Sequence, residues 1–109
     1  MTREFIITLA FDRLWGNLTL TDEDLRQLQA VLLKNPHAGD IIQGTGGARK
    51  IRLPLPGTGK SGGIRVIYYD ITHLGKLILL LCYQKTKQDG LTNQQKKQVK
   101  AIIESLKGV

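Results

Sequence analysis

The sequence predicts an α+β domain built on one antiparallel or mixed sheet. Two segments with helical periodicity, residues 22–34 and 93–107, flank a run of three consecutive β-type segments. The regular alternation of strand and helix that is typical of parallel sheets is missing from this run. A length of 109 residues and a mass of 12.1 kDa fit a single domain over residues 1–109.

The first part of the chain predicts a strand followed by helices. Residues 4–9 are rich in β-forming side chains, and residues 10–18 are expected to form a short helical turn. A longer helix is expected over 22–34, because Thr21 with Asp24 three residues later has the pattern of a capping box. The dipeptide Asn35-Pro36 should end it, since the residue before a proline disfavours helical geometry.

The middle of the chain predicts three strands, and the segments around the first of them are rich in glycine. Eight of the twelve glycines lie in 39–63, a stretch interrupted by the alternating segment 48–53. Residues 64–69 and 77–85 should pair as a hairpin across 70–75. The nearly continuous apolar run within the last strand predicts a central position with both faces covered.

The C-terminal helix is marked by its cap and its apolar stripe. Thr92 and Gln95 have capping-box spacing, and the stripe consists of Val99, Ile102, Ile103 and Leu106. Lys96, Lys97 and Lys100 occupy the opposite side, which predicts a solvated face. The expected architecture is therefore an N-terminal strand and helices, a three-strand antiparallel run and a C-terminal helix.

The charge of the chain is strongly positive and unevenly distributed. Sixteen Lys and Arg against nine Asp and Glu give +7, with an isoelectric point near 9.8. Residues 1–47 carry four basic and six acidic side chains, whereas residues 48–109 carry twelve basic and three acidic ones. This balance favours an anionic partner, with nucleic acid first and an acidic protein or membrane surface second.

Several classes of protein and site are excluded by the same composition. The single Cys82 rules out an internal disulfide and is expected in the core. His37 and His73 lack companion ligands at metal spacing and are expected to be solvated loop residues, so neither a metal nor a cofactor is predicted. Residues 57–62 match GxGxxG, but the segment that follows is β-type rather than helical. The N-terminus has no secretory apolar region and the longest apolar run is far below about 20 residues, so a cytoplasmic protein without membrane contact is expected.

A basic constellation remains as the candidate site. Strand alternation places Lys50 and Arg52 on one face of their strand, and Tyr83 and Lys85 on one face of theirs, with Arg65 at the start of the strand between them. Pairing of the three strands would bring these side chains to one patch, which Lys60 and Lys87 should border from loops. The candidate RNA-binding residues are Arg49, Lys60, Tyr83 and Lys87, with Arg49 on the opposite face of its strand from Lys50 and Arg52. Because the stretch 48–65 contains no carboxylate, a phosphate-backbone site is predicted. Arg and Lys also suit the stabilisation of charge on a reacting phosphate, and Lys50 and Lys85 are the candidate proton carriers.

Residues 39–52, 59–69 and 83–92, in that order, resemble the RelE/ParE toxin superfamily, and most closely its HigB-type branch. The resemblance implies a RelE-like fold and the toxin of a type II toxin–antitoxin pair. It further implies a ribosome-dependent mRNA endonuclease that cuts messages in the ribosomal A site. An antitoxin with a helix-turn-helix DNA-binding domain is the expected partner.

Carried over by position, the resemblance puts Lys50, Arg52, Arg65 and Lys85 in the catalytic cluster of RelE-type enzymes. That family has a base-stacking Tyr on its C-terminal helix, whereas residues 93–107 contain none, and Tyr83 is the aromatic available to replace it. Two alternatives remain, because fold does not fix activity. One is an inhibitor of DNA gyrase like the ParE branch, and the other is a non-catalytic RNA-binding module.

Overall fold

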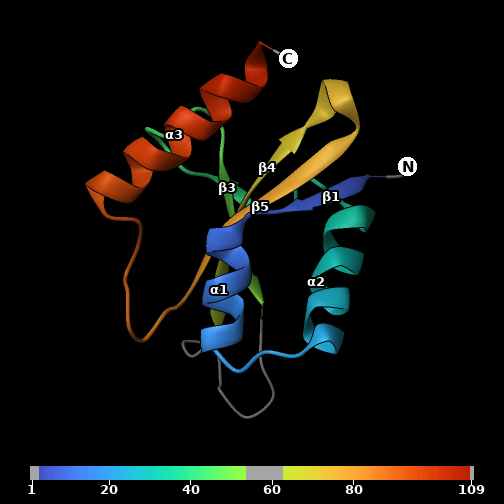
Figure 1. Cartoon of the computed structure of the whole chain (residues 1–109), viewed down its shortest axis with the longest axis vertical. Helices are drawn as coiled ribbons and strands as arrows, with labels where there is room; N and C mark the ends of the chain where they lie inside the picture. Colours follow the sequence, from blue (N-terminus) through green and yellow to red (C-terminus); the bar gives the residue numbers. More distant parts are fainter. Residues whose placement is uncertain (1–2, 54–62, 109) are drawn as a thin grey trace.

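The computed structural model describes residues 3–53 and 63–108, and it contains one five-stranded sheet with three α-helices (Figure 1). The elements in chain order are β1 (Glu4–Ile7), α1 (Leu9–Asn17), α2 (Asp22–Lys34), β2 (Asp40–Ile41), β3 (Arg49–Leu53), β4 (Ile64–Ile71), the 3-10 turn η1 (Thr72–Leu74), β5 (Lys76–Gln84) and α3 (Asn93–Lys107). The predicted α+β class is confirmed. None of the helices in these ranges has the length and apolarity needed to span a membrane.

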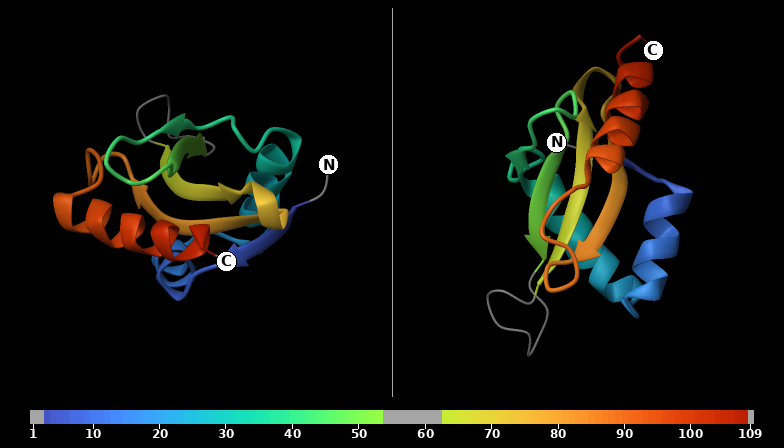
Figure 2. Two further views of the ribbon diagram at one scale, coloured as in Figure 1. Left: turned by 90° about the horizontal axis from the view of Figure 1, so that it is seen from above. Right: turned by 90° about the vertical axis from the view of Figure 1, so that its left-hand side faces the viewer.

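The sheet is mixed, with strand order β1-β5-β4-β3-β2. β3, β4 and β5 pair antiparallel as expected, while β1 pairs parallel with β5. The central position predicted for the apolar strand is confirmed, since β5 lies between β1 and β4. Figure 2 shows the twist of the sheet and α3 along one side of it.

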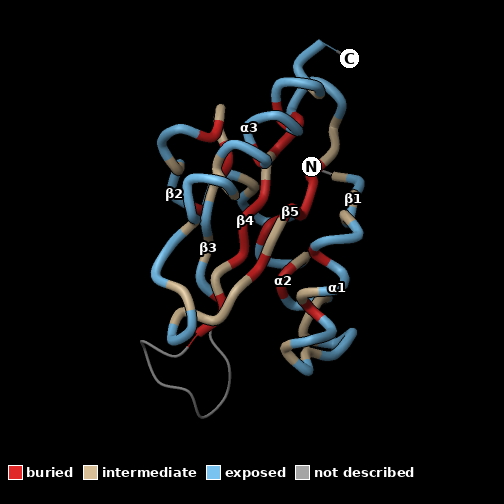
Figure 3. Tube along the Cα trace, turned by 60° about the vertical axis from the view of Figure 1, so that its left-hand side comes forward, coloured by how far each residue is buried: buried red, intermediate tan, exposed pale blue. Residues whose placement is uncertain are grey.

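Two apolar layers cover the two faces of the sheet. On one face, Phe11 and Trp15 of α1 and Leu28 and Leu32 of α2 pack against the buried side chains of β3, β4 and β5. On the other, Val99 and Ile103 of α3 pack against a second set that includes Ile67, Ile71, Ile78 and Leu80. Burial is concentrated along β4 and β5, as Figure 3 shows. Along β4 and β5, some side chains therefore pack under α1 and α2, and others pack under α3.

The helix boundaries follow from their caps. The capping boxes predicted at Thr21 and Thr92 are both present, with the Thr21 hydroxyl accepting from Asp24 N at 3.1 Å. The first strand ends at Ile7 rather than residue 9, because the Thr8 hydroxyl accepts from Phe11 N and begins α1 at Leu9. Local side-chain to backbone hydrogen bonds thus decide where the chain leaves the sheet.

The two-residue strand β2 was not predicted, and it depends on the buried Tyr68. The Tyr68 hydroxyl accepts from Gly39 N and donates to the Pro36 carbonyl, both at 2.9 Å. A Cβ at Gly39 would lie 2.6 Å from the Lys50 carbonyl oxygen, so only glycine permits this close approach. A contact across 29 residues of sequence, rather than β propensity, therefore positions β2.

Asp70 joins three separate segments, and one of its contacts is with the loop residue His37. Its buried carboxylate accepts from Arg3 Nε at 2.8 Å and from the Thr72 hydroxyl at 3.2 Å, and it lies 3.1 Å from His37 Nε2. The His37 side chain is 58% exposed in its loop, which confirms the expectation of a solvated loop histidine, and its contact with the buried acid is an additional finding. His73 is exposed in η1. Burial opposes ionisation of Asp70, but the hydrogen bonds and charge of Arg3 outweigh it and lower the pKa of the carboxyl.

Tyr68→Phe should lower the free energy of unfolding by about 1–3 kcal/mol, because a buried N–H and a carbonyl lose their partner. Urea denaturation measures the change. Tyr69→Phe is the matched control, since no hydrogen bond of its hydroxyl is seen among the described residues. An equal loss in both variants would contradict the role given to Tyr68.

Asp70→Asn should lower the melting temperature at pH 7, and the difference from the wild type should vanish at low pH. The pKa of Asp70 is lower in the folded state than in the unfolded state, so ionisation of this carboxyl stabilises the fold at pH values above the unfolded pKa of about 3.9. This stabilisation is lost as the pH falls through the folded-state pKa. Thermal melts of both proteins from pH 7 to pH 2 test it. A constant difference across that range would refute the linkage.

Candidate nucleic-acid interface

The register of the sheet brings the predicted basic residues together on the α3 side. Arg52 lies opposite Arg65, and Arg65 lies opposite Tyr83, so the three form one row across β3, β4 and β5. Lys50 lies one pleat further along β3, opposite Ile67, whose side chain belongs to the layer under α3. Lys85 follows the end of β5, and its backbone N donates to the Gly63 carbonyl. We call Lys50, Arg52, Arg65, Tyr83 and Lys85 the basic face.

α3 covers only part of this side of the sheet. Its buried residues Val99 and Ile103 pack against the end of the sheet that carries Ile71, Ile78 and Leu80. The row of Arg52, Arg65 and Tyr83 lies towards the other end, where β4 begins and β5 finishes. The same face of the sheet is therefore apolar under the helix and cationic beyond it.

Arg65 is the most constrained member of the basic face. It faces Arg52 directly across an antiparallel pair, an arrangement of like charges that is destabilising by itself. One of its terminal guanidinium nitrogens, Nη1, is buried and has no hydrogen-bond partner within residues 3–53 and 63–108. A buried N–H group without an acceptor is rare in folded proteins. An oxyanion placed between Arg52 and Arg65 would satisfy both features at once.

Two acids from outside the carboxylate-free stretch 48–65 lie at the borders of the basic face. Lys85 Nζ donates to Asp89 Oδ1 at 2.8 Å and to the Asp89 carbonyl at 3.0 Å, and Asp40 lies opposite Lys50 across β2 and β3. The hydrogen bond and positive charge of Lys85 lower the pKa of Asp89. Both acids lie outside the strand row of Arg52 and Arg65, so the positive charge is concentrated at its centre.

Tyr83 lies close to two cations, Arg65 and Lys85. Burial raises the pKa of its hydroxyl, and the charges of Lys85 and Arg65 oppose this shift. Tyr83 also lines a pocket of about 150 Å³ together with Ile42, Lys50, Gly90, Leu91 and Lys96. Lys96 was expected on a solvated helix face, but the structure places it in the wall of this pocket. Lys50 and Lys96 are far apart in the sequence, so local patterns do not predict that they line one pocket.

The other candidate RNA-binding residues, Arg49, Lys60 and Lys87, lie in different places. Arg49 lies on the Ile51 face of β3 and donates to the Gly39 carbonyl at 2.8 Å, so it is not brought to the basic face. Lys87 lines a neighbouring pocket of about 200 Å³ to which Tyr83 also contributes. Lys60 and the GxGxxG match at 57–62 lie outside the described residues, although the strand expected after that match is confirmed by β4.

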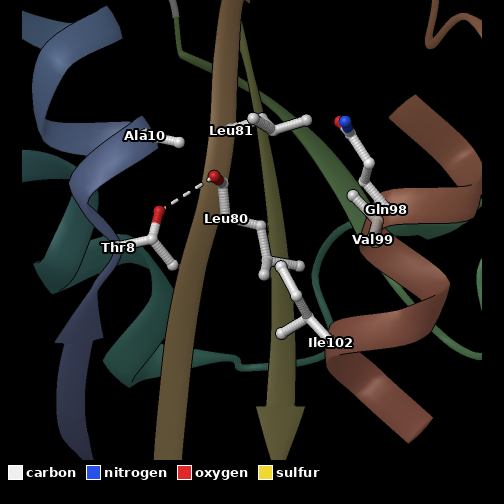
Figure 4. Close-up of a pocket in the computed structure, with 7 residues that line it drawn as sticks. All are labelled: Thr8, Ala10, Leu80, Leu81, Gln98, Val99 and Ile102. Atoms are coloured by element: carbon white, nitrogen blue, oxygen red, sulfur yellow. Dashed lines mark hydrogen bonds between the residues drawn. The ribbon is translucent and has the colours of Figure 1, made fainter. Parts of the chain in front are cut away.

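Cys82 and a further pocket lie apart from the basic face. The expectation that Cys82 is a core residue is confirmed, and burial raises the pKa of its thiol to about 12. A further pocket, shown in Figure 4, lies between α1, β5 and α3 and is lined by Thr8, Ala10, Leu80, Leu81, Gln98, Val99 and Ile102. It contains no ionisable side chain. Among the described residues, no three His, Cys, Asp or Glu side chains gather as metal ligands would.

Comparison with solved structures identifies the fold. A double Arg-to-Ala variant of the E. coli toxin RelE in the free state superposes with a TM-score of 0.58, over 82% of this chain and 90% of that one. The chain shares the RelE fold. Sequence identity to that structure is 17%, and no family model matches the sequence. The fold expected from the three sequence segments is thus confirmed, and the RelE-like sheet is what carries the basic face.

Asp89→Asn should strengthen non-specific RNA binding, because it frees Lys85 from its carboxylate partner. The slope of log K against log salt should steepen by about one, the contribution of one added phosphate contact. Fluorescence anisotropy with a labelled RNA over a range of salt measures both effects. Glu23→Gln on α2 adds the same charge away from the basic face and is the control. Equal changes in both variants would mean that only net charge matters.

Proposed function

We propose that this protein is a RelE-type toxin of a toxin–antitoxin pair, of the HigB branch, that cleaves mRNA in the ribosomal A site. The observation that carries the proposal is Arg65, which faces Arg52 across two strands and has a buried guanidinium nitrogen with no acceptor among residues 3–53 and 63–108. A phosphate diester would supply negative charge between the two facing guanidinium groups and an acceptor for the buried Arg65 nitrogen. The RelE fold and the sequence segments around these residues support the toxin assignment.

The proposed chemistry is transesterification at one phosphate of the message. The ribose 2′-oxygen attacks phosphorus, so that a P–O2′ bond forms while the P–O5′ bond breaks, leaving a 2′,3′-cyclic phosphate and a free 5′-hydroxyl. The 2′-hydroxyl proton passes to a base, and an acid donates a proton to the departing 5′-oxygen. Arg52 and Arg65 hold the phosphate oxygens and stabilise the negative charge that grows on them in the transition state.

Lys50 and Lys85 are proposed as the groups that handle the protons. Lys50 is on β3 and Lys85 follows the end of β5. The row formed by Arg52, Arg65 and Tyr83 crosses the three strands from β3 to β5. Lys85 is held in place by Asp89, which fixes its position while leaving the side chain about one-third exposed. Tyr83, whose pKa is raised by burial, remains a neutral phenol and presents an aromatic ring to the substrate.

The ribosome and an antitoxin complete the proposal as partners. The basic face is small, so the ribosome is proposed to position the message and thereby contribute to catalysis by orientation. The antitoxin, with a helix-turn-helix domain, is proposed to neutralise the toxin and to repress their common operon. The charge of +7 on this chain favours an acidic toxin-binding segment in that partner.

Primer extension on a defined mRNA tests the activity. The purified protein should produce cuts with translating ribosomes and none without them, because orientation by the ribosome is part of the proposed mechanism. Arg65→Ala combined with Lys85→Ala should reduce cutting by at least about a hundredfold, as losses of transition-state contacts do. Lys107→Ala, at the far end of α3, is the control.

The outcomes separate the alternatives. Cuts without ribosomes would indicate a free ribonuclease, and no cuts with RNA binding retained would indicate a non-catalytic module. Inhibition of supercoiling by purified gyrase would instead favour the ParE-type activity. In cells, growth arrest that persists in the double variant, or that co-expression of the adjoining reading frame fails to relieve, would contradict the proposed toxin and its pairing.

A further inference from the structure

We propose that the pocket formed by Lys50, Tyr83 and Lys96 binds one base of the message and selects guanine there. The inference deepens the proposed function, on which it rests, because it names the base recognised next to the phosphate held by Arg52 and Arg65. Lys96 is thereby assigned as a specificity-determining residue.

The pocket has the composition of a base site rather than of a second phosphate site. Its walls combine the tyrosine ring with the half-buried side chains of Ile42 and Leu91, and two lysines complete it. A phosphate gains nothing from apolar walls, whereas the faces of a base are apolar and stack on an aromatic ring. The volume of about 150 Å³ is well below that of a pocket for a drug-sized ligand, so it suits a single small planar group.

The pocket is continuous with the basic face. Tyr83 is opposite Arg65 on β4, and Lys50 shares the face of β3 with Arg52. A nucleotide whose phosphate lies between the two arginines therefore has Tyr83 and Lys50 as its next neighbours. Lys96 reaches the same pocket from α3.

The wall that carries Gly90 and Leu91 is fixed by hydrogen bonds. Gln88 Nε2 donates to the Gly90 carbonyl at 2.8 Å and to Gln95 Oε1 at 2.7 Å, and that same Gln95 oxygen accepts from Thr92 N. Asp89 is tied to Lys85 in the same turn. The segment between β5 and α3 is therefore organised before a ligand arrives, which reduces the entropy cost of binding.

The charged groups of the pocket determine which base edge it accepts. Lysine ammonium groups donate hydrogen bonds and accept none. Guanine presents two adjacent acceptors, O6 and N7, whereas adenine presents N7 beside an amino donor. Two lysines at one pocket therefore favour guanine, because adenine would direct its amino group at an ammonium that has no acceptor.

Binding of short 2′-O-methyl RNAs, which cannot undergo transesterification, tests the inference without ribosomes. Two labelled oligouridines that differ by one central G or A are titrated with the full-length protein by fluorescence anisotropy. The wild type should bind the guanine probe about tenfold more tightly than the adenine probe, the discrimination expected from one good two-acceptor contact. Lys96→Ala should reduce this ratio to near one.

Lys97→Ala is the matched control, since this neighbouring lysine is exposed on the same helix and lies outside the pocket. It should weaken both probes slightly and leave their ratio unchanged. Lys96→Gln, whose amide can both donate and accept, should recover binding of the adenine probe, and its thermal melt checks that the fold is intact. Equal binding of both probes by the wild type, or the same ratio in both alanine variants, would overturn the inference.

The cleavage assay distinguishes this inference from the proposed function. Ribosome-dependent cuts whose positions do not change in Lys96→Ala would leave the nuclease proposal standing and refute the guanine pocket. A Lys96-dependent guanine preference in binding without any cleavage would support the pocket and refute the nuclease. Loss of cuts beside guanine in Lys96→Ala, with cuts elsewhere retained, is the result expected if both hold.

Discussion

The antiparallel register of β4 is the constraint on which the rest of the structure depends. Its inner residues Ile64 and Val66 pack under α1 and α2, so a slip of one residue would exchange them with Arg65 and bury a guanidinium in the core. The apolar layers therefore specify the register, and the register places Arg65 opposite Arg52. The like-charge pair is therefore a consequence of the packing of the core, and it is the feature that a bound anion would stabilise.

A β-bulge in β5 decides which side Tyr83 faces. Ile67 pairs with Leu81 and Tyr68 with Leu79, so Leu80 is the additional residue. Leu80 and Leu81 both contribute to the layer under α3, after which Cys82 returns to the opposite layer and Tyr83 faces the basic side. Strict alternation from Leu77 would have directed Tyr83 into the layer formed by α1 and α2. The bulge thus lies between the part of β5 that packs under α3 and the part that carries Tyr83 on the basic face.

The sequence predicted the elements whose signals are local and missed those made by contacts between distant segments. Both capping boxes and the hairpin between β4 and β5 follow from short patterns, and alternation within β3 correctly grouped Lys50 with Arg52. β2 depends instead on a tyrosine hydroxyl from β4, and the bulge is invisible inside a uniformly apolar run. Lys96 was assigned to a solvated face because helix periodicity describes one element and not what lies opposite it. The ion pair of Lys85 has a different origin, because its partner Asp89 follows β5 and lies outside the carboxylate-free stretch 48–65.

The arrangement of acids and bases constrains how a reaction could proceed here. His37 and His73 lie near the end of β4 that is occupied by Asp70 and η1, whereas Arg65 is at its start. At about 3.3 Å per residue, that separation is on the order of 15–20 Å, beyond direct proton transfer. Within the described residues the basic face therefore offers only Lys50, Lys85 and Tyr83 as proton carriers beside two fixed arginines. A cluster of lysine, arginine and tyrosine side chains stabilises a negatively charged transition state well but transfers protons poorly near neutral pH. A substrate held in reactive geometry by a larger partner compensates for that deficiency, and this is the physical reason that the proposed nuclease requires the ribosome.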